Sequence, residues 1–116
     1  MVQMTMQLPE DLAERIRPLS AWLPTLLELS LVGYQTEAVA TATEVIEFLA
    51  TEPSSVEILN YHVSERAQQG LQRLLALNTA GLLSEPEQRE LDELERIEHI
   101  VIMLKAEVAA SSIGNS

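Results

Sequence analysis

The feature that most constrains the fold is one long segment near the C-terminus, residues 84–110, in which apolar side chains recur at intervals of three and four. Such spacing places them on one face of an α-helix, like the seam of a short coiled coil. Ser84 followed by Pro86 and Glu87 has the spacing of a helix-capping box and predicts the start of this helix. The seam consists of Leu94, Ile97, Val101, Leu104 and Val108.

The apolar run at residues 100–104 widens the apolar arc of this helix beyond a single seam. An arc of that width predicts burial on more than one side. The covering surface is either the core of the same chain or a second chain. The seam is therefore a candidate partner or dimer interface.

Composition favours helices elsewhere as well. Hydrophobic residues make up 47% of the chain but aromatic residues only 3%, so Leu, Ile, Val, Ala and Met must fill the core, which suits packing of helix on helix. Ser54 and Ser64 predict two further helix starts, and Gly33 and Gly81 predict two helix ends. A helix from Thr36 to Leu49 is expected to bury its apolar side. That side comprises Val39, Val45, Ile46 and Leu49.

Residues 2–8 alternate between apolar and polar side chains, with Val2, Met4 and Met6 on the apolar side. This period of two is typical of a half-buried strand. No second strand is evident, so the segment either pairs with another copy of the chain or forms an extended arm.

These patterns predict a mainly α protein of five to six helices, with a short N-terminal β-strand or extended arm and a long C-terminal helix. The length of 116 residues fits one helical domain over residues 1–110. Residues 2–8 form its strand or arm, residues 84–110 its long acidic helix, and residues 111–116 read as a disordered tail.

The net charge is −11, from 18 acidic and 7 basic residues. This balance repels phosphate backbones and anionic lipid and favours a basic protein partner. The long helix carries a dense acidic run, which is either its solvated face or a patch for that partner. The patch consists of Glu87, Glu90, Asp92, Glu93 and Glu95. No membrane segment or leader is recognisable, and the expected location is the cytoplasm.

Catalytic patterns are not found in the sequence. The chain has no cysteine, and its two histidines, His62 and His99, fall in different predicted helices without the spacing of a metal site. Glu44 and Glu47 share one helix face, which a charged outer surface explains. We expect no catalytic residue, no bound metal and no cofactor.

Residues 4–16, MTMQLPEDLAERI, resemble the opening of ribbon-helix-helix repressors. In that family, strands of two copies pair and the resulting ribbon enters the major groove of DNA. The resemblance implies that Gln3, Thr5 and Gln7 face the bases. Arg15 and Arg17 would be the nearby cations for phosphates.

Residues 74–94, LLALNTAGLLSEPEQRELDEL, together with residues 103–106, MLKA, resemble a segment of small uncharacterised bacterial proteins, many of them cyanobacterial. Some of these proteins are called antitoxin-like. The resemblance implies a stoichiometric partner protein, such as a basic toxin or nuclease.

The function predicted from the sequence is therefore a non-enzymatic, antitoxin-like protein-binding module that forms a homodimer and neutralises or docks a basic partner. A homo-oligomeric assembly adaptor without DNA contact is the first alternative. A ribbon-type DNA-binding repressor is the second.

Overall fold

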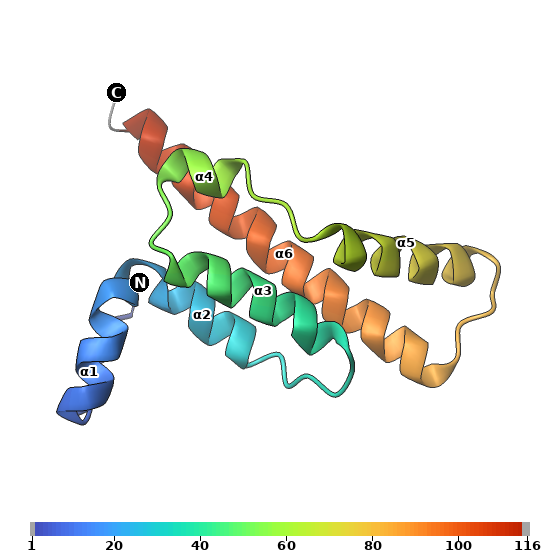
Figure 1. The fold of residues 1–116 in the computed structure, drawn as a ribbon, viewed down its shortest axis with the longest axis horizontal. Coiled ribbons are helices and arrows are strands. Elements are labelled where there is room, and N and C mark those ends of the chain that lie inside the picture. The colour runs from blue at the N-terminus through green and yellow to red at the C-terminus, as the bar shows by residue number, and fades with distance from the viewer. Residues whose placement is uncertain (1, 115–116) are drawn as a thin grey trace.

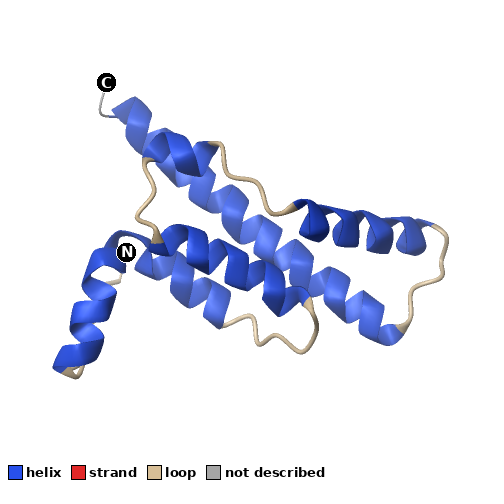
Figure 2. Ribbon diagram, in the orientation of Figure 1, coloured by secondary structure: helices blue, strands red, loops and turns tan. Residues whose placement is uncertain are grey.

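A computed structural model of the chain describes residues 2–114, with side chains described up to residue 111. Within this range it contains helices and loops and no strand (Figures 1 and 2). The elements are α1 (Glu10–Ile16), the 3-10 helix η1 (Arg17–Trp22), α2 (Leu23–Ser30), α3 (Ala38–Ala50), α4 (Ser55–Leu59), α5 (Glu65–Thr79) and α6 (Glu85–Gly114). The prediction of a mainly α fold with five to six helices and a long C-terminal helix is confirmed.

Helix α6 is the element on which the fold is built. It runs along the length of the molecule, and α2, α3, α4 and α5 all pack against it (Figure 1). Its buried apolar side chains are Leu91, Leu94, Ile97, Ile100, Leu104 and Val108, with Val101 half-buried. The seam predicted from the sequence therefore lies in the core of its own chain, and these residues are not an exposed interface.

Three serines begin helices as their spacing predicted. The Ser54 hydroxyl accepts a hydrogen bond from the Glu57 N–H at 3.2 Å, and the Glu57 carboxylate accepts one from the Ser54 N–H. Ser84 and Glu87 make the same reciprocal pair at the start of α6. Ser64 caps α5 through the Ala67 N–H at 3.2 Å. Each cap satisfies a backbone N–H that the first helical turn leaves without a partner.

Two glycines end helices by adopting positive φ, which residues with a Cβ resist. Gly81 has φ 72°. It follows α5 and lets the Leu82 N–H donate to the Leu77 carbonyl at 2.9 Å. Gly33, with φ 69°, turns the chain after α2.

The buried side of α3 agrees only in part with the one predicted: Val45 and Leu49 are buried as expected, but Val39 and Ile46 are not. Ala38, Ala42, Val45 and Leu49 are buried, whereas Val39 is 47% exposed and Ile46 37% exposed. The buried set has spacings of four, three and four, which define one helix face. Its two alanines let the α3 backbone approach its neighbours closely, and this closeness outweighs the larger side chains of Val39 and Ile46.

The predicted N-terminal strand is not formed in the described chain. Residues 2–9 have no regular structure, and Val2 and Met4 are 88% and 87% exposed. A strand needs a partner to satisfy its backbone, and the rest of the described chain is helix and loop. The extended arm is the alternative that the structure shows.

Helix α1 contains no buried residue in the described structure. It packs on η1 and projects away from the other helices (Figure 1). At the other end, α6 continues through residue 114, so residues 111–114 are helical where a disordered tail was predicted. The last two residues of that predicted tail lie outside the described residues.

Candidate protein-binding groove

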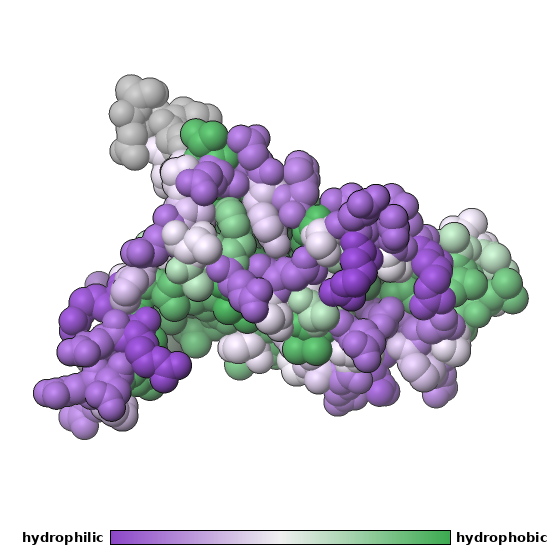
Figure 3. Space-filling view, viewed as in Figure 1, coloured by the Kyte–Doolittle hydropathy of each residue, from purple (hydrophilic) through white to green (hydrophobic). Residues whose placement is uncertain are grey.

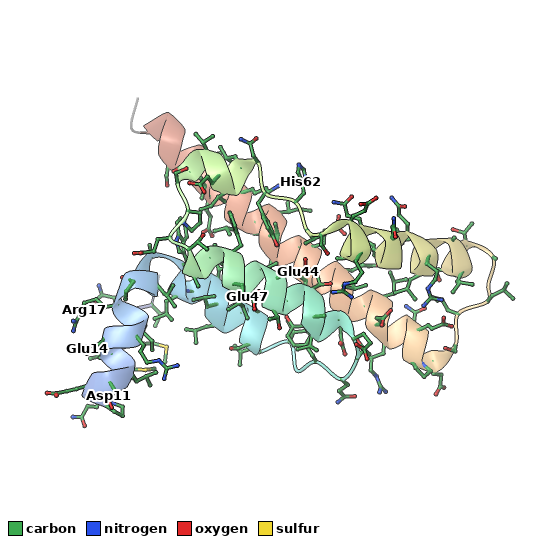
Figure 4. The ribbon with its side chains drawn as sticks, viewed as in Figure 1. Asp11, Glu14, Arg17, Glu44, Glu47 and His62 are labelled. Atoms are coloured by element: carbon green, nitrogen blue, oxygen red, sulfur yellow. The ribbon has the colours of Figure 1, made fainter. Side chains whose placement is uncertain are left out.

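An apolar groove lies between α5, α6 and the loop that joins α4 to α5. Its volume is about 300 Å³. The apolar part of its lining consists of Val63, Ala67, Leu71, Leu94, Ile97, Val101 and Ile102. Six further residues, which carry polar groups, complete the lining: Thr41, Tyr61, His62, Gln68, Glu98 and Lys105. Figure 4 shows His62 on the loop before α5.

The loop that forms one wall is fixed by two contacts. The Lys105 ammonium donates a hydrogen bond to the Tyr61 carbonyl at 2.7 Å, which ties the loop to α6. The Tyr61 ring stacks on Phe48 of α3 with centroids 4.2 Å apart and an angle of 12° between the planes. The wall is thereby attached to two helices, so the groove is preformed.

Glu44 of α3 stabilises the far end of the same loop. Its carboxylate accepts a hydrogen bond from the Ser64 N–H at 3.3 Å and lies 3.8 Å from the Arg66 guanidinium. Burial, and secondarily the Glu44 charge, raise the pKa of Tyr61. Glu47, the other member of the predicted carboxylate pair, is exposed on the outer side of α3 (Figure 4). The Glu44 carboxylate therefore holds the loop, whereas the Glu47 carboxylate faces solvent, and the two do not form one site.

Glu93 does not belong to the exposed acidic patch in which the sequence placed it. Its side chain is only 8% exposed. It accepts hydrogen bonds from the Gln35 N–H at 3.0 Å and the Thr36 hydroxyl at 2.6 Å. The Thr36 hydroxyl in turn accepts from the Ala38 N–H at 3.1 Å at the start of α3. Glu93 thus connects α6 to the loop between α2 and α3.

The spacing of Glu93 contained a signal for this burial. It lies four residues before Ile97 and seven before Ile100, on the helix face that enters the core. Two causes raise the pKa of the neighbouring Tyr34: mainly its burial, and to a smaller extent the negative charge of Glu93. The Tyr34 hydroxyl finds no hydrogen-bond partner among the described residues.

The other predicted acidic residues lie at or near the surface. Glu87 is bound to Ser84 and to Arg73 at 3.2 Å. Hydrogen bonds lower the pKa of Glu87, those from Ser84 more than the one from Arg73. Glu90 is half-buried, whereas Asp92 and Glu95 are exposed. Glu98, the last member of the acidic run, is exposed at the edge of the groove.

The candidate DNA-contacting residues all lie at the N-terminal end. Gln3, Thr5 and Gln7 are exposed on the arm, and Arg15 and Arg17 are exposed on α1 and η1. The described chain brings them into no paired ribbon. Figure 4 shows Arg17 on the same projection as two carboxylates, those of Asp11 and Glu14. With Glu10, these acids outnumber the two arginines and oppose binding of phosphate.

His62 lies in the loop between α4 and α5, and not in a helix as predicted, whereas His99 is exposed on α6. Within the described side chains, no three His, Asp or Glu residues are grouped in a way that would hold a metal ion. Among the described helices, none combines the length and the apolar character needed to span a membrane.

Most of the visible surface is hydrophilic over α1 and α5 in the view of Figure 3. Apolar residues gather at the end formed by the loop between α5 and α6, where Leu82 is 68% exposed.

No known protein family, characterised protein or solved structure shows a detectable match to the chain.

Proposed function

We propose that the protein is a non-enzymatic protein-binding module that holds an apolar, positively charged segment of a partner protein in the groove between α5 and α6. The observation that carries this proposal is the preformed apolar groove with Glu98 at its edge. Ligand sites have volumes of about 300–1,000 Å³. The groove lies at the lower end of this range, which suits a few side chains of a partner helix.

Charge supports the choice of a basic partner. The chain carries a net charge of −11, and the exposed carboxylate of Glu98 lies on α6 at the edge of the groove. Acidic surface accelerates the encounter with a basic protein and discriminates against acidic competitors. The apolar walls then provide the binding free energy by removing apolar surface from water.

The resemblance of residues 74–94 and 103–106 to antitoxin-like proteins supports a more specific proposal. The partner is then a small basic toxin or nuclease inside the cell, bound stoichiometrically and neutralised. Leu94 and Ile97 form the floor of the groove from the core side, and the half-buried Val101 offers more surface to the partner.

Peptide selection tests the proposal without a known partner. A random peptide library displayed on phage is selected on the immobilised full chain. We expect enriched sequences with apolar residues at helical spacing flanked by Lys or Arg. Enriched peptides without basic residues would contradict the charge argument, and no enrichment at all would overturn the groove as a binding site.

Matched substitutions then locate the bound peptide. Ile102 lines the groove and is 55% exposed, so Ile102→Gln, which adds no charge, should weaken peptide binding about tenfold without unfolding the chain. Leu82→Gln is the control, because Leu82 is also exposed and lies outside the groove. Equal losses from both variants would indicate adhesion to any apolar surface.

A further inference from the structure

Helix α6 has a second exposed stripe on the side facing away from the core, polar towards its N-terminal end and made of Met103 and two alanines towards its C-terminal end. His99, Met103, Ala106 and Ala110 are spaced four, three and four residues apart, so they share one helix face. All four are exposed, and Met103 is 47% exposed. Towards the N-terminus, Arg96 and Asp92 continue the same face and are also exposed. No helix of the described chain covers this stripe.

We propose that this stripe, from Asp92 to Ala110, binds the same stripe of a second copy, with the two α6 helices antiparallel. The pairing is separate from the groove and does not depend on the partner proposed above. An isologous interface requires a surface that is complementary to itself after a two-fold rotation. The distribution of charge along the stripe meets this requirement.

The charge complementarity comes from one residue at each end. Arg96 is exposed at the polar end, and Glu107 is exposed eleven residues later beside the apolar end. In an antiparallel pair whose two-fold axis lies midway between them, each Arg96 meets the partner copy's Glu107. The methylene stem of Arg96 then lies over the small side chain of the opposing Ala106.

The distribution of acid along α6 selects this orientation. Seven acidic residues and two arginines lie within residues 85–98, whereas residues 99–111 contain one lysine and one glutamate. A parallel pair would place the two acidic halves side by side, where like charges repel. An antiparallel pair separates them to opposite ends. The nearly neutral apolar half also gives a basic partner little to bind, so a second copy fits it better.

Introduced cysteines test the orientation, because the natural chain has none. Met103 lies close to the proposed axis, so Met103→Cys should form an intermolecular disulfide under mild oxidation. Asp92→Cys is the matched control on the same stripe. The two copies of residue 92 would lie about 28 Å apart along the helix axis, from a rise of about 1.5 Å per residue. Cross-linking of both variants would show a parallel pair and overturn the proposal.

Exchanging the charges at residues 96 and 107 tests the proposed ion pair between the two copies. The fraction of dimer is measured by sedimentation over a wide concentration range. Wild type should show a reversible monomer–dimer equilibrium. Arg96→Glu and Glu107→Arg should each weaken the dimer about tenfold, and the double variant should restore it. Glu47→Arg, on the outer side of α3, is the control for a change of net charge. A monomer at all concentrations, or a double variant no tighter than the singles, would overturn the pairing.

Discussion

Glu93 gives the sharpest test of how the fold is held together. Replacing it with alanine removes a carboxylate that is 8% exposed and accepts two hydrogen bonds, from the Gln35 N–H and the Thr36 hydroxyl. A hydrogen bond to a charged group contributes about 1.5–3 kcal/mol. Since one carboxylate accepts both, we expect Glu93→Ala to lower the free energy of unfolding by about 3–4 kcal/mol.

Urea denaturation followed by circular dichroism measures this loss, and Tm should fall by about 12–16 °C at about 4 °C per kcal/mol. Glu95→Ala is the control, because Glu95 is exposed and its loss should change the free energy by about 0.5 kcal/mol or less. Thr36→Val completes a double-mutant cycle with Glu93→Ala. A loss at Glu93 no larger than that at Glu95, or additive effects in the cycle, would refute the role of this network.

Three further outcomes follow from local features of the chain. Hydrogen bonds lower the pKa of Glu87 in the folded state below its ordinary value of 4.5. The carboxylate therefore contributes stability above pH 4.5, and this contribution is lost as the pH falls through the lower folded-state pKa. Glu87→Gln removes the titrating group, so Tm should fall less steeply in acid than it does for the wild type. Tyr34→Phe should raise stability by about 1 kcal/mol in urea denaturation, because it removes a buried hydroxyl that has no partner among the described residues, and a loss of stability would show that the hydroxyl is satisfied. Gly81→Ala should cost about 1 kcal/mol because φ is 72°, whereas Gly70→Ala, inside α5 with open space around it, should add about 0.5–1 kcal/mol; thermal melts that show the same sign for both would contradict the backbone argument.

Helix boundaries could be predicted because their signals act within a few residues. The Ser54, Ser64 and Ser84 hydroxyls each bond to a backbone N–H three residues later. Gly81 ends α5 through its own backbone angle. Such features depend little on the rest of the fold, so the sequence alone locates them.

The buried face of α3 and the binding groove depend on contacts distant in sequence. Val39 and Ile46 are more apolar than Ala38 and Ala42, and only the close approach that alanine permits decides which face enters the core. The groove combines residues from Thr41 to Lys105. No local pattern predicts which side chains from four elements meet at one place.

The position of α6 in the chain also has a consequence for biosynthesis. Every helix that packs on α6 precedes it, so each leaves the ribosome before the surface that will cover its apolar side exists. Until residues 85–108 are synthesised, Leu29, Leu49 and Leu74 lack the helix that buries them in the finished core. We therefore expect the nascent chain to be open to chaperones and proteases until α6 emerges, and a chain interrupted before Glu85 to be degraded without accumulating.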